Sequence, residues 1–368
     1  MYKVVVCGTG NVGRHALRAI VEHPQLELAG VRAFSAAKRG LDAGELIGTA
    51  PLGVTAVTEL DEVLKIKADC VLYCGLGSTI PGGFDQTVDD LCTLLRAGFN
   101  VTASTLEHLI HPVIVPEALQ KLSDACAEGG SSFYDTGINP GFAMDLWPIT
   151  MTRLSRSIDQ VRTTEVVDMS RYDSVMAREF MGFGKPDGPT PMDAMHQDSL
   201  RSPFYASLRQ VADALGVTLS DVRYERENAL AGRPVDVAIG RLEPGTVAAL
   251  KMTFVGVVDG RDFLANSWVW RMSDDVAPGW PTGDQWLLEI DGDPQLRSCF
   301  DLSTGFDAKR PVSLTVATLN VNAIPALCQA APGVQTNLTL PVFAGGYPAW
   351  RAGAKLPANR VHRVIGLI

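Results

Sequence analysis

The sequence has 368 residues, a length typical of two or three domains. Apolar residues make up 46% and charged residues 20%, as in ordinary globular proteins with sizeable cores. The 32 basic residues against 41 acidic ones give a net charge of −9. This charge argues against nucleic acid or an anionic membrane as the main partner, because both require a basic surface.

Membrane insertion and secretion are also disfavoured by the sequence. No uncharged apolar run reaches the roughly 18 residues that a membrane-spanning helix needs. The apolar run near the start, residues 4–7, is too short for a signal peptide. Seven cysteines, an odd number without any CxxC pair, are typical of free thiols in a reducing compartment. We therefore expect a cytoplasmic protein.

The first 140 residues alternate between short apolar runs and amphipathic stretches. The pattern predicts strands at residues 3–7, 26–34, 69–73, 100–103 and 132–136, and helices at 12–22, 84–97 and 116–128. Alternation of this kind indicates an α/β Rossmann fold, a doubly wound parallel sheet covered on both faces.

Beyond residue 140 the segments become longer and alternate with period two. Strands expected at 160–169, 246–258, 265–272 and 286–291 indicate a second, α+β domain built on an open mixed or largely antiparallel sheet. Residues 180–188 read as a loop and 202–215 as a helix. A helix over 321–331, ended by Pro332 and Gly333, is expected to return to the first domain. The predicted division is 1–140 for dinucleotide binding, 141–318 for substrate and dimerisation, and 319–368 for the C-terminal helix and tail.

A glycine pattern lies between the first predicted strand and the first helix. It is the GxGxxG sequence of Gly8, Thr9, Gly10, Asn11, Val12 and Gly13. In this context the first glycine permits a tight turn, the second lets the backbone approach a pyrophosphate, and the third lets helix and strand pack closely. The helix N-terminus adds free N–H groups and a partial positive charge. The sequence therefore predicts a dinucleotide site.

The end of the second strand indicates which dinucleotide is preferred. NAD sites usually place an acidic residue there to hold the ribose hydroxyls, and the end of this strand has none. Four residues surround the expected place of a 2′-phosphate instead: Arg32, Ser35, Lys38 and Arg39. We expect NADP, with NAD as the second possibility; the alternative is that Lys38 and Arg39 belong to a solvated loop. Gly75 and Gly77, after the strand at 69–73, are expected to line the same crevice.

Several stretches, in order along the chain, resemble a known family. They are residues 8–13, 100–107, 136–142, 165–172, 182–184 and 321–325. Together they resemble the NAD(P)-dependent amine dehydrogenases related to 2,4-diaminopentanoate dehydrogenase, whose N-terminal domain is similar to that of dihydrodipicolinate reductase. The likeness extends from residue 1 to about residue 345. It implies a homodimer that deaminates a small amine oxidatively, or aminates a small ketone or aldehyde with ammonia in reverse.

The resemblance also implies roles for four residues. Glu107 falls at the family's catalytic glutamate, where a carboxylate can hold ammonia or act as a general base on water. Tyr172 and His196 fall at positions that line the substrate pocket. Asn139 is expected to contact the nicotinamide carboxamide or the pocket floor. The structural alternatives are a helix-start carboxylate for Glu107, a satisfied surface or core histidine for His196 and a turn former for Asn139.

The sequence also bears on the type of substrate and on alternative functions. Four residues around the expected pocket are mostly apolar and favour a small hydrophobic substrate: Met144, Trp147, Met176 and Phe180. Histidine and cysteine spacings do not indicate a metal site. Two alternatives remain: an imine or carbonyl reductase of the dihydrodipicolinate reductase-like group, and a catalytically inactive NADP-binding sensor. The reductase alternative is disfavoured because this sequence has no His-His-Lys stretch like that of the dihydrodipicolinate reductase-like group. The sensor alternative is disfavoured because a sensor would not need Glu107.

Overall fold

The computed structural model describes residues 1–75, 77, 82–105, 107–111, 115–197, 202–302 and 311–346. Its first sheet has seven parallel strands in the order β15-β6-β5-β4-β1-β2-β3. The strands are β1 (Tyr2–Cys7), β2 (Leu26–Arg32), β3 (Ala56–Val57), β4 (Cys70–Tyr73), β5 (Asn100–Ala103), β6 (Ser132–Asp135) and β15 (Gly333–Gln335). The predicted doubly wound Rossmann sheet is confirmed.

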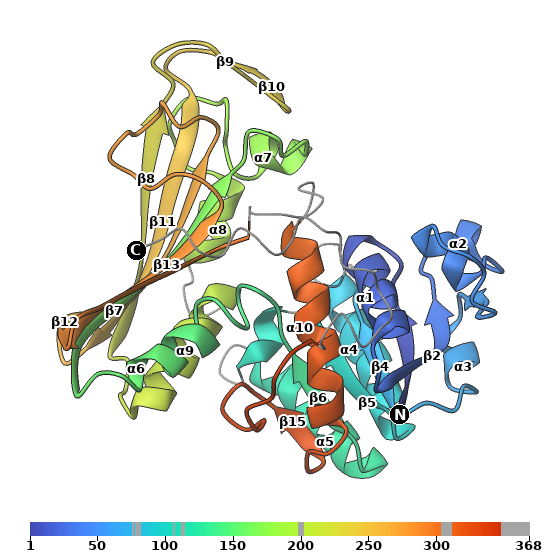
Figure 1. The fold of residues 1–368 in the computed structure, drawn as a ribbon. Helices are drawn as coiled ribbons and strands as arrows, with labels where there is room; N and C mark the ends of the chain where they lie inside the picture. The colour runs from blue at the N-terminus through green and yellow to red at the C-terminus, as the bar shows by residue number, and fades with distance from the viewer. Residues whose placement is uncertain are drawn as a thin grey trace, which may run out of the picture.

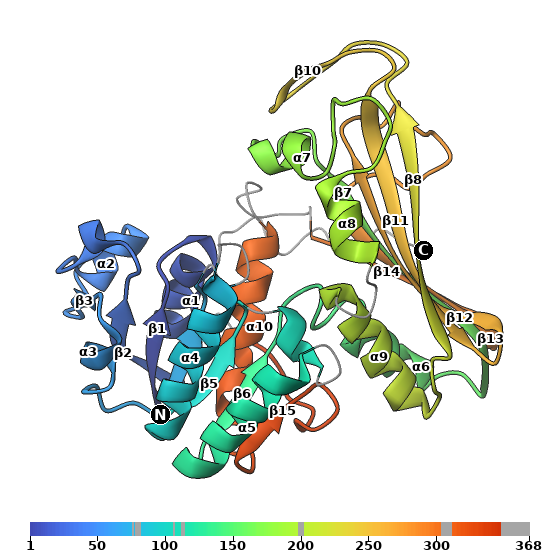
Figure 2. The same ribbon diagram turned by 180° about the vertical axis from the view of Figure 1, so that it is seen from behind.

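Helices cover both faces of this sheet (Figures 1 and 2). Since side chains alternate along a strand, Val4 and Val6 of β1 face one layer while Val5 and Cys7 face the other. The first layer holds α1 (Asn11–Glu22) and α10 (Pro311–Leu327), and the second holds α3 (Leu60–Val63), α4 (Gly83–Arg96) and α5 (Pro116–Gly129). Continuous burial on both faces explains the unbroken apolar runs of β1 and β4.

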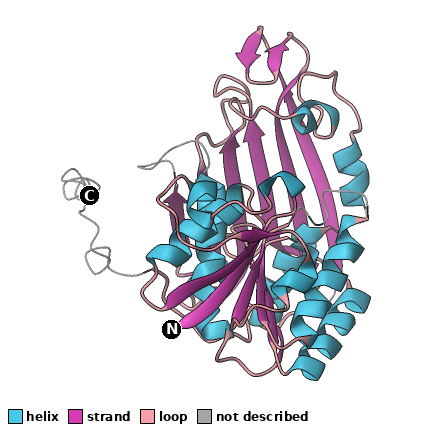
Figure 3. Cartoon of the chain, turned by 90° about the vertical axis from the view of Figure 1, so that its right-hand side faces the viewer, coloured by secondary structure: helices cyan, strands magenta, loops and turns pink. Residues whose placement is uncertain are grey.

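The second domain is built on a six-stranded sheet in the order β14-β13-β7-β12-β11-β8. These strands are β7 (Ser157–Asp168), β8 (Asp221–Leu230), β11 (Val247–Val258), β12 (Arg261–Arg271), β13 (Gln285–Asp293) and β14 (Leu296–Asp301). The pair β7 and β12 is parallel and the others are antiparallel, so the sheet is mixed, as expected. A hairpin of β9 (Val235–Val237) and β10 (Gly240–Leu242) extends from one end of the domain (Figure 3).

One face of the second sheet carries the core of this domain. Side chains such as Met252, Phe254 and Trp268 point from the strands toward the helices. These helices are α6 (Leu146–Thr152), α7 (Val175–Glu179), α8 (Pro191–Gln197) and α9 (Pro203–Leu215). The opposite face carries charged pairs, among them Lys251 with Glu227. The sheet is therefore amphipathic, with its apolar face covered within the chain.

The C-terminal helix differs from the prediction. Helix α10 runs from Pro311 to Leu327, so it begins and ends earlier than residues 321–331. Its sequence is apolar almost throughout and rich in β-branched residues, which hides the helical period. It packs on α1 of the first domain through Val321, Ile324 and Leu327. Among the described residues, no helix is long and apolar enough to span a membrane.

Candidate active site

The carboxyl ends of β1, β4, β5 and β6 meet at one edge of the parallel sheet. Three contacts draw the turn after β5 to the turn after β4. Thr105 Oγ1 lies 3.3 Å from the carbonyl oxygens of both Tyr73 and Gly75, and the Ser104 N–H donates to Tyr73 O at 3.2 Å. In open α/β sheets, ligands bind outside this edge. The predicted cofactor and catalytic residues after these strands therefore share one edge.

The glycine turn has the geometry that a dinucleotide requires. Gly8 has φ +117°, and a Cβ there would lie 2.4 Å from the carbonyl oxygen of Cys74. A Cβ on Gly13 would lie 1.9 Å from Gly8 O, so only glycine lets α1 pack this closely. At Gly10 a Cβ would meet no atom within 4 Å, so the backbone there faces open space. Gly10 also has no side chain to cap α1, which leaves the helix N–H groups available to a pyrophosphate.

The four residues after β2 fall into two groups. Lys38 Nζ donates to Thr9 O at 2.9 Å and contacts Thr9 Oγ1 at 3.1 Å, so its charge lies against the glycine turn. Ser35 is exposed and precedes the short 3₁₀ turn η1 (Ala36–Lys38). The structure thus brings Lys38 to the glycine turn, and Ser35 lies at the start of the 3₁₀ turn that carries Lys38.

The two arginines are engaged elsewhere. Arg32 pairs with Asp90 at 2.7 Å, largely buried, and Asp90 also accepts from the Tyr73 hydroxyl at 3.0 Å. Arg39 is exposed and holds Glu62 with both terminal nitrogens, at 2.8 and 2.7 Å. The hydrogen bonds from Arg39 keep the pKa of Glu62 low, at about 2. In this arrangement neither guanidinium is directed at the glycine turn.

Glu107 begins the 3₁₀ turn η3 (Glu107–Ile110) directly after β5. Its backbone is described, and its side chain lies outside the described parts of the structure. The turn is anchored on α9, because Ile110 packs on Tyr205 and Ala206. Next to it, His111 Nε2 lies 2.8 Å from Asp213 Oδ2 on α9. Both domains thus fix the segment that carries Glu107.

Two of the predicted substrate residues, Asn139 and Tyr172, lie in different surroundings. Asn139 follows β6 at the edge described above and donates to Glu165 in the second domain. Tyr172 lies in the turn after β7 and is 43% exposed. A Cβ at Gly75 would lie 3.1 Å from the ring of Tyr73 and 3.2 Å from that of Phe34, and Gly77 has φ +35°.

His196 lies inside the second domain. It is 1% exposed, its Nδ1 lies 3.1 Å from Ser202 Oγ, and rings of Phe204, Tyr224 and Phe254 surround it. Burial lowers its pKa to about 4. This placement is that of a neutral core histidine, and it does not favour the predicted contact with substrate.

The expected apolar pocket residues are also dispersed. Met144 is completely buried in the core of the second domain, whereas Met176 is 49% exposed on its surface. Trp147 packs edge-on against Phe300 at 4.8 Å. Phe180 lies against the same core as Met144.

Sequence reasoning missed a carboxylate at the domain junction. Glu165 on β7 is 9% exposed and accepts from Asn139 Nδ2 at 2.9 Å. It also accepts from the indole N–H groups of Trp286 at 3.1 Å and Trp270 at 3.3 Å. Burial raises the pKa of Glu165, against the opposing effect of these three donors. One signal in the sequence could have identified this residue. Glu165 lies four positions after Val161 on β7, so both side chains point to the core face of the strand.

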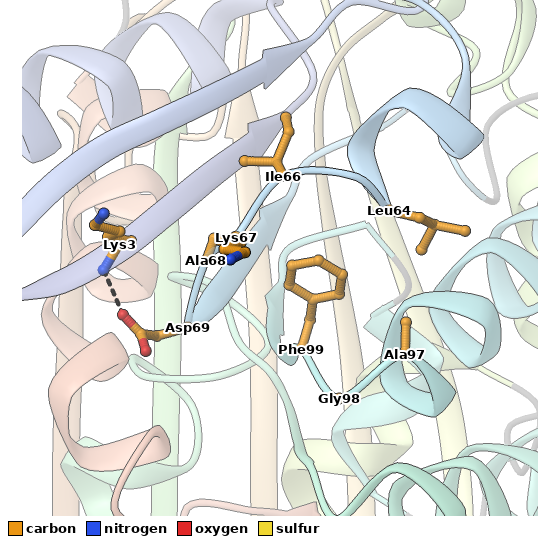
Figure 4. A pocket seen from close by; sticks show the side chains of 9 residues that line it. All are labelled: Lys3, Leu64, Ile66, Lys67, Ala68, Asp69, Ala97, Gly98 and Phe99. Atoms are coloured by element: carbon orange, nitrogen blue, oxygen red, sulfur yellow. Dashed lines mark hydrogen bonds between the residues drawn. The ribbon is translucent and has the colours of Figure 1, made fainter.

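A depression on the surface lies at the other edge of the parallel sheet (Figure 4). It is lined by residues before β4 and β5, among them Ile66, Asp69 and Phe99, and by Lys3 of β1. The Lys3 N–H donates to Asp69 there at 2.6 Å. Since dinucleotides bind at the carboxyl ends of the strands, this depression is separate from the candidate site. In the described ranges, no cluster of three or more His, Cys, Asp or Glu side chains is placed to hold a metal ion.

The fold and the glycine turn define a two-domain protein with a Rossmann sheet of the dinucleotide-binding class. Residues 2–74 match the family described as dihydrodipicolinate reductase, N-terminus, and residues 142–352 match the 2,4-diaminopentanoate dehydrogenase C-terminal domain. An amine dehydrogenase of Streptomyces virginiae is 32% identical over 354 residues, 93% of this chain and 97% of that protein. The chain belongs to the family of amine dehydrogenases related to 2,4-diaminopentanoate dehydrogenase.

Two further relatives extend the comparison. The 2,4-diaminopentanoate dehydrogenase of Acetoanaerobium sticklandii is 25% identical over 361 residues, covering 92% of this chain and 93% of that protein. The solved structure of an amine dehydrogenase from Mycobacterium smegmatis superposes with a TM-score of 0.73 at 20% identity. It covers 95% of this chain and 98% of that one, so the two share the complete fold.

Proposed function

We propose that this protein is an NADP-preferring amine dehydrogenase. It deaminates a small amine oxidatively, and in reverse aminates a small ketone or aldehyde with ammonia. The observation that supports this most directly is the common edge of the parallel sheet, where the glycine turn lies beside the segments bearing Glu107 and Asn139. The match to the amine dehydrogenase covers 97% of that protein, and the match to the 2,4-diaminopentanoate dehydrogenase covers 93%.

The residues present fit a dinucleotide. The open backbone at Gly10 and the uncapped start of α1 would hold the pyrophosphate. Gly75, after β4, is expected to let the backbone approach the nicotinamide end. When bound, the nicotinamide supplies or accepts the hydride, and the protein orients the reacting carbon.

Glu107 is the proposed catalytic residue. Its carboxylate would hold the substrate nitrogen by a charge-assisted hydrogen bond and take a proton from water during deamination. The packing of Ile110 on α9 and the contact of His111 with Asp213 fix the turn that presents it. Tyr172 is proposed to lie at the substrate, where its ring and hydroxyl can both contribute.

Replacing Glu107 with Gln tests this assignment. The variant keeps the size of the side chain and removes its charge and basicity, so we expect turnover to fall by at least about a hundredfold. NADPH affinity, measured by fluorescence titration, should stay within a few-fold of the wild type. Full retained activity would contradict the catalytic role, and a comparable loss of NADPH binding would move Glu107 to the cofactor site.

The preference for NADP is proposed to depend on Lys38. Its ammonium group lies against the glycine turn, where it can meet a 2′-phosphate, whereas Arg39 is held by Glu62. Lys38→Ala should weaken NADP binding by about tenfold or more while changing NAD binding little. Arg39→Ala is the matched control that removes the neighbouring charge. Equal losses for both dinucleotides on Lys38→Ala would place the phosphate contact elsewhere, and a selective loss only on Arg39→Ala would assign it to that residue.

We further propose a homodimer in the cytoplasm. The dimer would pair through the charged face of the second sheet, and the seven cysteines, all described, are free thiols. Light scattering on the full chain should give twice the mass of one chain. A mass equal to one chain at micromolar concentration would contradict the proposed dimer.

A further inference from the structure

Glu165 is a buried carboxylate without a positively charged partner in the described part of the chain. Its three hydrogen-bond donors are one amide and two indoles, all neutral. Buried charges in proteins are normally paired, because an unpaired ion away from water is costly. A carboxylate can accept about four hydrogen bonds, so capacity remains for another donor. The described residues therefore supply no cation to Glu165 and leave part of its hydrogen-bonding capacity unused.

The neighbouring amide supplies a second, independent observation. Asn139 directs its Nδ2 to Glu165, which leaves Oδ1 as the acceptor on the other side of the amide. This Oδ1 is buried and has no hydrogen-bond partner within the described residues. A buried acceptor without a partner is uncommon in native proteins and often marks the place of a missing ligand or water. Glu165 and the amide bonded to it thus each have capacity for a further donor, at neighbouring positions.

Glu165 and Asn139 lie where the two domains meet. Asn139 follows β6 at the edge that holds the glycine turn and the Glu107 segment. Glu165 projects from the face of β7 that carries the covered core. By contrast, the buried Asp145 accepts from four groups, Gly141 N, Leu146 N, Ser207 Oγ and Asn337 Nδ2, and is fully used within the fold.

We propose that Glu165 and Asn139 form a binding site for a positively charged N–H group of the substrate, an alkylammonium or iminium nitrogen. The inference rests on the proposed function and names the chemistry of the substrate end. Such a group supplies both the missing charge for Glu165 and the missing donor for Asn139 Oδ1. Trp270 and Trp286 hold the carboxylate in place and form apolar walls beside it. The nitrogen is either the one that reacts or a second one on the same substrate.

An equilibrium titration tests the site without turnover. Trp270 and Trp286 both contact Glu165, so binding of n-butylammonium should change tryptophan fluorescence in a saturable way. 1-Butanol, of similar size and uncharged, is the matched ligand and should give no saturable change. Glu165→Gln should weaken n-butylammonium binding by about tenfold or more. Glu227→Gln, with the same loss of charge on the opposite face of the sheet, should leave it unchanged.

Asn139→Ala provides a second variant should Glu165→Gln fail to fold. It leaves the carboxylate in place and removes the unpartnered acceptor, so it should also weaken n-butylammonium. Equal responses to n-butylammonium and 1-butanol, or an affinity unchanged in both variants, would overturn the proposal. That result would mean that water or a protonated Glu165 satisfies the site.

Steady-state kinetics then identifies which nitrogen binds. If it is the reacting one, Glu165→Gln raises the KM for ammonium with a simple ketone. If it is a second one, the variant lowers kcat/KM for an amino ketone relative to a neutral ketone of equal length. An unchanged ratio together with an unchanged ammonium KM would remove the site from the catalytic cycle. Wild-type enzyme that binds n-butylammonium yet aminates no ketone would contradict the proposed function and leave the site intact.

Discussion

Two glycines of the glycine turn, Gly10 and Gly13, are needed for different reasons. Gly13 is required by packing, since its Cβ would lie 1.9 Å from the backbone of Gly8. Gly10 has ordinary backbone angles and open space around it, so the fold alone does not require a glycine there. Its requirement comes from the ligand, which the backbone must approach closely.

Alanine substitutions separate these two requirements. Gly13→Ala should destabilise the protein by about 2–3 kcal/mol, because helix α1 must move away from β1. Gly10→Ala should cost less than about 1 kcal/mol and weaken NADPH by about tenfold or more. Urea unfolding and fluorescence titration measure the two effects. A stable, tightly binding Gly10→Ala protein would show that the backbone does not approach the dinucleotide at this residue.

At the residue scale, the glycine turn could be predicted from the sequence, whereas the hydrogen-bonded site around Glu165 could not. GxGxxG is local, so its meaning depends only on the strand before it and the helix after it. The contacts of Glu165 come from Asn139, Trp270 and Trp286, which lie far apart in the chain. The distribution of expected pocket residues between core and surface has the same cause, because burial depends on tertiary packing.

Among the elements, α10 illustrates how the C-terminal segment stabilises the first domain. Asn320 in the middle of this helix is completely buried. Its Oδ1 accepts from Thr102 Oγ1 of β5 at 2.6 Å, and its Nδ2 donates to Thr136 O at 3.2 Å. The helix is thus tied by polar groups to the ends of two central strands, beside its apolar contacts with α1.

Removing this polar tie should destabilise the domain. Asn320→Ala leaves two buried groups without their partner, and we expect a loss of about 2–3 kcal/mol. Thr318→Ala is the control on the same helix, because Thr318 bonds only one turn back to Leu314 O. Thermal unfolding should show a lower Tm for Asn320→Ala than for Thr318→Ala. Equal melting temperatures would mean that the apolar contacts alone hold α10.

The elements also show where sequence patterns fail. The central strands and their helices were predictable because both faces are buried and the apolar runs are continuous. Edge strand β8 was missed, since Val222 and Tyr224 alternate with charged residues and few of its side chains are buried. The boundary proposed at residue 319 falls inside α10, because that helix joins the second domain to the first.

For the whole molecule, stability should depend on pH through its buried histidines. The pKa of His196 is lowered to about 4 by burial, and burial also lowers that of His111. The unfolded chain protonates histidine near pH 6.5, so it binds more protons than the folded one below that pH. His196 alone should therefore cost on the order of 3 kcal/mol of stability between pH 6.5 and 4.

Urea midpoints at pH 7.5 and 5 measure this effect. The midpoint should fall on acidification in the wild type and fall less in His196→Phe, whose ring can join Phe204, Tyr224 and Phe254. The same slope in both proteins would assign the pH dependence to other groups. Unchanged amine dehydrogenase activity in the variant would support a purely structural role for His196.

The central claim is that residues at the shared edge of the parallel sheet catalyse the reductive amination of a ketone or aldehyde with ammonia. The most direct measurement is NADPH oxidation by the full chain with a panel of small ketones and aldehydes, with and without ammonium. We predict oxidation that requires ammonium and yields the corresponding amine. Oxidation that proceeds equally without ammonium, or tight NADPH binding with no oxidation of any carbonyl compound, would contradict this account.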